Sequence, residues 1–346
     1  MTGFINRRLA VKNGLTTSFS LGIGACQSSD FKARIGPQPL TIKPNRLRAG
    51  DTIGLIAPGG LVDDNAIDRS VRNLQSQNFK VKLGSNIGAK WGGYAGTPRQ
   101  RVDDLHTMFS DPTIKAIWAV RGGSGANALL PWLDFDLIQA NPKILIGYSD
   151  VTALLLAINY RTGLVCFHGP VASSTFSDFS VANLKVVLME AAERYTFKLD
   201  SDYQASHQVI HSGIAQGRLM GGNLSVITAL SGTPYLGSLF SKLLFLEEVS
   251  EAPYRIDRMF NQLQQIGLSQ TAAVMLGVFT KCDPPDLDPT LTLNEVLSSQ
   301  LRHLSLPSVY GYPFGHITGQ LTLPIGVLAQ LDTHAKSLTL LEAAVQ

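Results

Sequence analysis

Short apolar runs alternate with segments of helical periodicity through residues 52–160, and this alternation constrains the fold more than any other feature of the sequence. Each run has the length of a buried strand and stops at a glycine-rich or polar turn. Because strands that alternate with helices form parallel sheets covered on both faces, we predict an α/β domain of the Rossmann or flavodoxin-like type over residues 48–195. The predicted strands are 52–57, 79–81, 116–120 and 144–147, and the predicted helices are 64–75, 99–109, 126–130 and 151–160.

The pattern changes after a polar stretch, which we predict to be a linker over residues 196–214. Beyond it the strand and helix signals mix less regularly. We predict a smaller, barrel-like mixed α/β domain over residues 215–346. Its predicted helices are 224–230, 256–265 and 293–304, and its predicted strands are 243–246, 273–279 and short segments near Val309 and Val327.

The first 25 residues have the parts of an export signal. Arg7, Arg8 and Lys12 form a charged start, and the paired arginines resemble a twin-arginine signal. The weakly apolar stretch that follows is much shorter than the ~20 residues that cross a bilayer. We therefore predict a signal segment over residues 1–25 and a periplasmic protein. Because hydroxyl residues interrupt the apolar stretch, a cytoplasmic enzyme with an N-terminal extension remains the alternative.

Residues 23–26, Ile-Gly-Ala-Cys, resemble a bacterial lipobox, in which the cysteine is lipidated after cleavage. Cys26 is therefore a candidate lipidation site, and a lipid anchor there is the membrane contact that we predict. The following residues are largely polar and carry three prolines, at 37, 39 and 44. We predict a tether over residues 26–47.

Charge and cysteine content exclude several classes of protein. The formal net charge is +3, but three of the positive charges lie in the predicted signal, so the rest of the chain is neutral. A neutral chain without a basic stripe gives no reason to expect a nucleic-acid partner. Cys26, Cys166 and Cys282 have no metal-ligand spacing, and we predict no metal and no cofactor. Cys166 and Cys282 are expected to be buried apolar residues.

Ser149 follows an apolar strand and precedes an apolar helix, in the string Gly147-Tyr148-Ser149-Asp150. A strand-to-helix turn presents a hydroxyl at a sharp bend, and the next backbone N–H can face a developing oxyanion. Ser149 is therefore a candidate nucleophile. Serine is also a preferred helix N-cap, which is the alternative interpretation of this position.

The turn Arg121-Gly122-Gly123 follows the strand that ends at Val120. Its glycines allow the backbone to approach a ligand, and the Arg121 guanidinium can bind a carboxylate. An ordinary glycine-rich turn explains the pattern equally well.

Two further positions carry acid–base chemistry. Glu247 and Glu248 end an apolar strand, and His316 follows a turn that contains Gly315. A serine nucleophile needs a general base, and an imidazole base needs an acidic partner that fixes its tautomer. Spacing does not pair these residues, and His168 is equally available.

Several strings follow one another along the chain: Gly50-Asp51-Thr52-Ile53, Arg121-Gly122-Gly123-x-Gly125, Ile146-Gly147-Tyr148-Ser149-Asp150, Phe167-His168-Gly169-Pro170, Gly221-Gly222-Asn223-Leu224, Leu246-Glu247-Glu248, Pro253-Tyr254-Arg255 and Pro313-Phe314-Gly315-His316. In this order they resemble the LD-carboxypeptidases, a family of serine peptidases that includes murein tetrapeptide carboxypeptidases and microcin-immunity peptidases. The resemblance covers about residues 48–335. One departure is Ala57-Pro58-Gly59-Gly60, where the family usually has serines after the Ala-Pro pair.

The resemblance implies catalytic roles for three residues: Ser149 as nucleophile, His316 as base and Glu247 as its acidic partner. It further implies an oxyanion hole formed by backbone N–H groups of Asp150, Gly122 and Gly123. Because Ser149 lies in the first predicted domain and the other two in the second, domain closure or a homodimer is expected to gate activity.

The resemblance also implies the substrate, a muropeptide from which the terminal D-Ala is removed. Such a peptide carries several carboxylates, and Arg121 and Arg255 are candidate partners for them. Arg255 as a member of a structural ion pair is the alternative. Two other functions stay open: a microcin-type immunity peptidase, and a lipoprotein that binds murein peptides without cleaving them.

Overall fold

Five parallel strands make up most of the first sheet in the computed structural model, which describes residues 39–199, 203, 207–283 and 290–346. The strand order 2-1-3-4-5 is that of flavodoxin-like sheets, and it confirms the predicted parallel α/β architecture. The order reverses between β1 and β3, where ligands of such sheets bind beyond the carboxyl ends of the strands. In spatial order the strands are β2 (Lys80–Leu83), β1 (Thr52–Ile56), β3 (Ile114–Ala119), β4 (Ile144–Gly147) and β5 (Cys166–His168).

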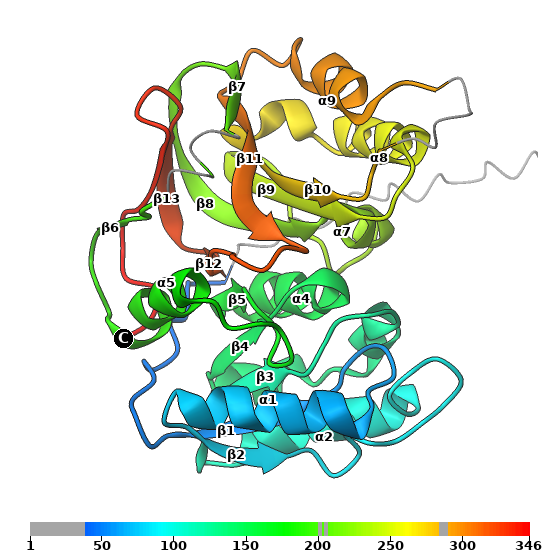
Figure 1. Ribbon diagram of the computed structural model, residues 1–346, viewed down its shortest axis with the longest axis vertical. Helices are drawn as coiled ribbons and strands as arrows, with labels where there is room; N and C mark the ends of the chain where they lie inside the picture. Colours follow the sequence, from blue (N-terminus) through cyan, green and yellow to red (C-terminus); the bar gives the residue numbers. More distant parts are fainter. Residues whose placement is uncertain (1–38, 200–202, 204–206, 284–289) are drawn as a thin grey trace, which may run out of the picture. The chain divides into compact units, whose positions relative to one another are not determined.

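Helices cover both faces of this sheet (Figure 1). The connection from β1 to β2 runs in the opposite direction to the one from β2 to β3, so right-handed crossovers place the first helix and the second on opposite faces. The predicted helix at 126–130 is a 3-10 helix that contains Pro131. The α-helices are α1 (Asp64–Ser76), α2 (Pro98–Ser110), α3 (Phe135–Ala140), α4 (Thr152–Thr162) and α5 (Asp178–Met189), and the 3-10 helices are η1 (Ala126–Trp132) and η2 (Ser149–Val151).

The second sheet has eight strands and mixes parallel with antiparallel pairs. Its centre, β8-β9-β10-β11, is parallel, and the outer strands are antiparallel. The predicted mixed α/β architecture is therefore confirmed. In spatial order the strands are β6 (Tyr195–Thr196), β14 (Ser337–Leu340), β13 (Leu328–Asp332), β8 (Ile214–Asn223), β9 (Lys242–Val249), β10 (Ala273–Thr280), β11 (Ser308–Gly315) and β7 (Gln208–His211). The helices of this part are α7 (Leu224–Leu230), α8 (Pro253–Gln265), α9 (Leu293–Leu301) and the 3-10 helix η3 (Leu268–Gln270).

The two sheets exchange strands. Strand β12 (Leu323–Ile325), late in the chain, pairs antiparallel with β5 at the edge of the first sheet. Strand β6, which spans the predicted boundary between the first domain and the linker, pairs with β14 in the second sheet. Helix α4 lies between the sheets (Figure 1) and contacts β8 and α7. The predicted boundaries 48–195 and 215–346 stay predictions, but the sheets do not follow them at these two strands.

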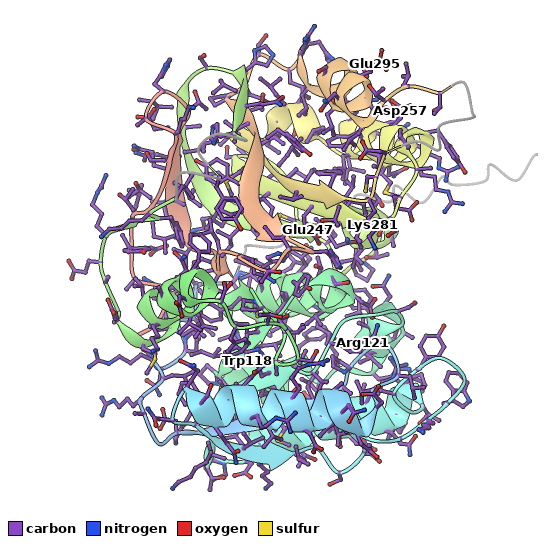
Figure 2. The ribbon with its side chains drawn as sticks, in the orientation of Figure 1. Trp118, Arg121, Glu247, Asp257, Lys281 and Glu295 are labelled. Carbon is purple, nitrogen blue, oxygen red and sulfur yellow. The ribbon has the colours of Figure 1, made fainter. Side chains whose placement is uncertain are left out.

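Buried apolar side chains form the core around both sheets. Trp118 in the first sheet is fully buried (Figure 2), and its indole N–H donates to the Pro170 carbonyl at 2.8 Å. Cys166 and Cys282 are buried free thiols, as predicted.

Residues 42–47 are fixed to the folded chain, although we predicted them to be part of a tether. Ile42 exchanges backbone hydrogen bonds with Gly163 and Val165, and Leu47 is buried. The polar composition hid these pairings, since their partners lie more than a hundred residues away. The signal segment 1–25, Cys26 and the first part of the tether lie outside the described residues. Within the described ranges, no helix has the length and apolar character needed to cross a membrane.

Candidate active site

Ser149 lies at the predicted strand-to-helix turn, directly after β4 and Tyr148. Its backbone φ is 62°, in the left-handed region that a residue with a Cβ adopts at a cost of about 1–2 kcal/mol. The side chain is half-buried, and it does not cap the helix: η2 has Tyr148 as N-cap, and α4 has Val151, neither with a side-chain cap bond. The N-cap interpretation is therefore wrong. The strained turn instead holds the hydroxyl at the carboxyl edge of the first sheet.

The Arg121-Gly122-Gly123 turn packs against Ser149 without room for another atom. A Cβ on Gly122 would lie 2.7 Å from the Ser149 Cβ, 2.9 Å from its Oγ and 3.1 Å from the backbone N of Asp150. Gly123 has a φ of 104°, and a Cβ there would approach the backbone of Gly60 to 2.8 Å. Only glycine fits at either position, so backbone groups of this turn lie beside the hydroxyl.

The loop after β1 completes the same packed layer. The Gly60 N–H donates to the Gly122 carbonyl at 2.9 Å. A Cβ on Gly59 would lie 2.6 Å from that carbonyl oxygen and 2.7 Å from Oδ2 of Asp150. The departure from serine at this position therefore matches the close approach of the two loops in this chain.

The side chains of Asp150 and Arg101 connect these loops through hydrogen bonds. Asp150 Oδ2 accepts from the Ala126 N–H at 2.9 Å, and burial raises the pKa of its carboxyl group. Arg101, only 2% exposed, donates to the carbonyls of Pro58 at 2.8 Å and Gly125 at 3.1 Å. The buried guanidinium thus bridges the loops after β1 and β3. Arg101 was not among the predicted site residues, although a charged residue on the apolar face of a helix, four residues before the buried Leu105, was the available signal.

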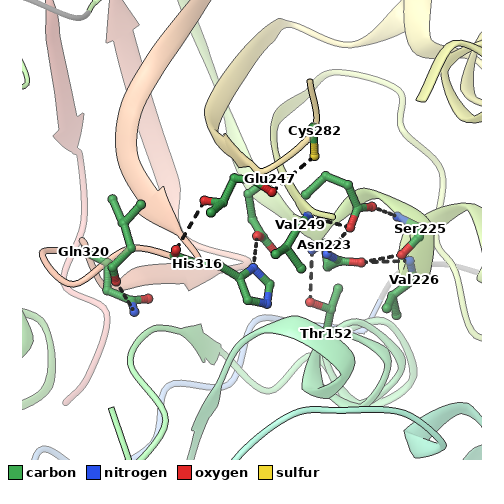
Figure 3. Close-up of polar contacts among 12 residues, drawn as sticks. Thr152, Asn223, Ser225, Val226, Glu247, Val249, Cys282, His316 and Gln320 are labelled. Atoms are coloured by element: carbon green, nitrogen blue, oxygen red, sulfur yellow. Dashed lines mark hydrogen bonds and ion pairs between the residues drawn. The ribbon is translucent and has the colours of Figure 1, made fainter. Parts of the chain in front are cut away.

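Glu247 and His316 meet at the end of the second sheet that faces the first (Figures 2 and 3). His316 Nδ1 lies 2.8 Å from Oε2 of Glu247, whose side chain is completely buried, whereas the His316 side chain is 20% exposed. An ionised carboxylate only accepts hydrogen bonds, so this contact places the proton on Nδ1 and leaves Nε2 as a base. Gly315 permits the approach, because a Cβ there would lie 3.0 Å from the Cβ of Glu247.

Strand β10 lies between the strands that carry these two residues. Its register shifts around Gly277 against both β9 and β11, and a Cβ on Gly277 would lie 2.5 Å from the Phe314 carbonyl. Such irregularities redirect side chains at the ends of sheets. The shift therefore accompanies the approach of Glu247 and His316 across an intervening strand.

The Tyr148 ring links the two halves of the site. It lies edge-on to His316, with ring centroids 4.9 Å apart, and it is the residue before Ser149. Among the described residues the Ser149 hydroxyl makes no hydrogen bond, to His316 or to any other group. The structure therefore places the residue before the predicted nucleophile in ring contact with His316, and no hydrogen bond joins Ser149 to the imidazole.

His168 is fully buried behind the site, edge-on to the rings of Phe245, Phe314 and Tyr148. Neither of its ring nitrogens has a hydrogen-bond partner in the described part of the chain. Burial lowers its pKa to about 4, which outweighs the opposing effect of the nearby Glu247 carboxylate. His168 is therefore neutral and inaccessible, so it does not compete with His316 as a base.

Glu248 faces away from the imidazole and holds the start of α7. Its Oε1 accepts from Asn223 Nδ2 at 2.9 Å, and its Oε2 accepts from the Ser225 N–H at 2.8 Å (Figure 3). The Asn223 N–H donates in turn to Thr152 Oγ1, at the start of α4, at 3.1 Å. Of the two adjacent glutamates, only Glu247 contacts His316, and Glu248 belongs to the junction between the sheets.

The two predicted carboxylate partners lie in different surroundings. Arg121 is exposed at the edge of the first sheet, where its Nη1 donates to the Leu61 carbonyl at 3.2 Å. Arg255, in the first turn of α8, contacts Glu251 at 3.4 Å and the Tyr254 hydroxyl at 3.0 Å. These exposed contacts match the ion-pair interpretation of Arg255. No group of three or more His, Cys, Asp or Glu side chains suited to a metal ion is present among the described residues.

Comparison with known proteins identifies both halves of the chain. Residues 53–169 match the LD-carboxypeptidase N-terminal domain, and residues 216–331 match the LD-carboxypeptidase C-terminal domain. The probable murein peptide carboxypeptidase of Bacillus subtilis is 36% identical over 88% of this chain and 96% of its own length. The murein tetrapeptide carboxypeptidase of Pseudomonas aeruginosa is 32% identical over 81% of this chain and 92% of its own length.

The chain is also similar to a protein named for self-immunity. The microcin C7 self-immunity protein MccF of Escherichia coli is 30% identical over 89% of this chain and 97% of its own length. A solved structure of MccF in complex with glutamyl sulfamoyl guanosine superimposes with a TM-score of 0.82 at 29% identity, covering 88% of this chain and 99% of that one.

Proposed function

Since the chain belongs to the LD-carboxypeptidase family and is a serine-type carboxypeptidase, we propose that it removes the terminal D-Ala from murein tetrapeptide, with Ser149, His316 and Glu247 as its catalytic residues. The observation that carries this proposal is the hydrogen bond of 2.8 Å between His316 and a completely buried Glu247, next to the turn that presents Ser149.

In the proposed mechanism His316 Nε2 takes the proton of the Ser149 hydroxyl as Oγ attacks the scissile carbonyl. Glu247 keeps the proton on Nδ1 and stabilises the imidazolium that forms. The imidazolium then protonates the departing amine of D-Ala, and water releases the acyl group from Ser149 by the same route in reverse. This step requires His316 Nε2 within hydrogen-bond distance of Oγ, and both side chains are partly exposed.

The oxyanion of the tetrahedral intermediate is assigned to backbone donors beside Ser149. Candidates are the N–H groups of Asp150, Gly122 and Gly123, because a Cβ on Gly122 would meet both the Ser149 Oγ, at 2.9 Å, and the Asp150 backbone N, at 3.1 Å. Fixed donors in this layer would need no reorganisation as negative charge develops.

The similarity to MccF supports a second candidate function, cleavage of a peptide–nucleotide conjugate of the microcin type. Both functions use the same acyl transfer and differ in the leaving group. Membership of a peptidase family favours either of them over binding without turnover.

The deciding experiment is D-Ala release from murein tetrapeptide, followed by mass spectrometry, for the wild type and Ser149→Ala. We expect release by the wild type and a loss of at least ~10³-fold in Ser149→Ala. Ser76→Ala, which changes an exposed serine at the end of α1, is the matched control and keeps full activity. Equal rates for wild type and Ser149→Ala would refute the nucleophile. Cleavage of the conjugate without D-Ala release would favour immunity.

For localisation we propose export and an N-terminal lipid anchor, on the strength of the paired arginines and the lipobox-like string that ends at Cys26. Cell fractionation of wild type and Cys26→Ser tests this. The wild type is expected in the membrane fraction and Cys26→Ser in a soluble one. Wild-type protein in the cytosol with an intact N-terminus would rule out the anchor.

A further inference from the structure

A pocket of about 350 Å³ opens beside the Arg121-Gly122-Gly123 turn. It lies at the carboxyl ends of β1, β3 and β5, where the strand order reverses. The lining residues come from the loop after β1, helix α1, the loop before α2 and the turns after β3 and β5: Leu61, Val62, Asp63, Ala66, Arg69, Lys90, Arg121 and Ser173.

Three of the lining side chains are cations, and none of them has a carboxylate partner within 4 Å in the described ranges. Arg69 donates through Nε to the Ser173 carbonyl at 2.9 Å, and Arg121 donates to the Leu61 carbonyl at 3.2 Å. These contacts orient the guanidinium groups and leave other N–H donors for a ligand. Lys90 makes no hydrogen bond to any described residue, and its side chain is exposed.

Asp63 is the single acidic residue of the pocket, and its carboxylate is already engaged. It caps α1, where Oδ1 accepts from the Ala66 N–H at 2.7 Å. Three cations against one committed carboxylate leave an excess of positive charge, which favours an anionic ligand.

The backbone connects this pocket to the nucleophile. Arg121 directly precedes Gly122, which contacts Ser149, and Leu61 directly follows Gly60, whose N–H bonds the Gly122 carbonyl. A substrate held at Ser149 therefore has this pocket as its neighbour at the same edge of the sheet.

We propose that the pocket binds an anionic group of the substrate, a carboxylate or a phosphate away from the scissile bond, and that Arg69 and Lys90 determine specificity together with Arg121. This inference rests on the proposed function and extends it to two residues outside the catalytic machinery. A murein tetrapeptide would present a carboxylate, and a nucleotide conjugate would present a phosphate.

The experiment compares charge-removing variants with matched controls. Lys90→Met and Arg69→Gln are paired with Lys80→Met on β2 and Arg72→Gln on α1, which change exposed cations outside the pocket. For tetrapeptide cleavage we expect kcat/KM to fall roughly tenfold in each pocket variant, through KM rather than kcat, and to stay unchanged in the controls. The charge-conserving variants Arg69→Lys and Lys90→Arg should recover most of the lost kcat/KM. About 0.5 M NaCl should reduce the difference in kcat/KM between the wild type and the charge-removing variants.

Substrate variants identify the anionic group. Tetrapeptides amidated at one carboxylate at a time should be cleaved more slowly by the wild type. For the peptide that lacks the carboxylate bound by the pocket, Lys90→Met should cause no further loss of activity. If only the nucleotide conjugate responds to the substitutions, the pocket binds phosphate.

Failure of this inference is distinct from failure of the proposed function. Wild-type turnover with an unchanged KM for both the tetrapeptide and the nucleotide conjugate in both pocket variants would overturn the inference alone. Absence of wild-type turnover would overturn the proposed function, and tetrapeptide binding to Ser149→Ala would then decide on the pocket. Weaker tetrapeptide binding after Lys90→Met and Arg69→Gln are added to Ser149→Ala would support the pocket as an anion site. Equal binding, or no binding by Ser149→Ala itself, would overturn the inference.

Discussion

The two halves of the site differ in how they are held in place: the half that carries Ser149 depends on close backbone packing, and the half that carries Glu247 and His316 depends on a buried charge. On the first sheet, Ser149 sits in a strained backbone turn against Gly122, and the layer that contains Gly59, Gly122 and Gly123 has no space for an additional Cβ. On the second sheet, the site depends on a completely buried carboxylate bonded to a partly exposed imidazole. The nucleophile half should therefore be sensitive to added atoms, and the acid–base half to changes of charge at constant volume.

The largest effect is expected from Glu247→Gln. The amide keeps the volume but presents a donor or a neutral acceptor to His316, which destabilises the imidazolium and the required tautomer. We expect kcat for D-Ala release to fall about 10³- to 10⁴-fold, with the folded structure retained by circular dichroism. Glu248→Gln is the matched control, since Glu248 does not contact His316, and it should keep most of the activity. A fall in kcat of less than tenfold in Glu247→Gln would mean that the Glu247–His316 half of the site does not depend on the negative charge of Glu247.

Adding one carbon to the other half tests the converse. In Gly122→Ala the new Cβ would lie 2.7 Å from the Ser149 Cβ and 2.9 Å from its Oγ, so the turn or the serine must move. A displaced nucleophile and displaced oxyanion donors should lower kcat about 10²-fold or more. Gly88→Ala serves as control, because a Cβ there has no atom within 4 Å. Similar kinetics for the two variants would contradict the close packing of this half.

These halves also differ in how far the sequence predicted them. Apart from α3, which was not predicted, and the predicted helix at 126–130, which is a 3-10 helix, the strands and helices from β1 to α4 were predicted to within a few residues, because each is a local apolar or helical pattern. Strands such as β12 were missed, since three residues become a strand only by pairing with β5, as in Leu323 with His168. The Ser149 turn is likewise a local strand–helix signal.

The pairing of Glu247 with His316 could not be derived from spacing. The two residues are 69 positions apart and meet only because β9 and β11 lie on either side of β10. Family resemblance selected them, whereas residue patterns alone left His168 equally eligible. Burial, which periodicity does not give for an isolated histidine, separates the two imidazoles.

The buried His168 should make the free energy of unfolding depend on pH. Its pKa in the folded protein is about 4, below the ordinary 6.5, so between these values the unfolded chain binds a proton that the folded protein does not. The free energy of unfolding should therefore fall as the pH drops from about 6.5, and the loss should approach about 3 kcal/mol near pH 4. His168→Phe, which keeps an aromatic ring among aromatic neighbours, should remove this component. Urea denaturation between pH 4 and pH 7 measures it, and parallel curves for the two proteins would refute it.

The smallest expected effect compares two capping boxes, one in each part of the chain. Thr97 caps α2 together with Gln100, and Thr292 caps α9 together with Glu295, so an alanine at either position should cost about 1 kcal/mol of stability. Only α2 carries Arg101, the guanidinium that joins the loops beside Ser149. Thr97→Ala should therefore also lower kcat, by about two- to fivefold, through loss of positioning. Thr292→Ala should leave kcat unchanged while shifting the urea midpoint by a similar amount. Equal kcat values in the two variants would show that the loop layer holds its geometry without the start of α2.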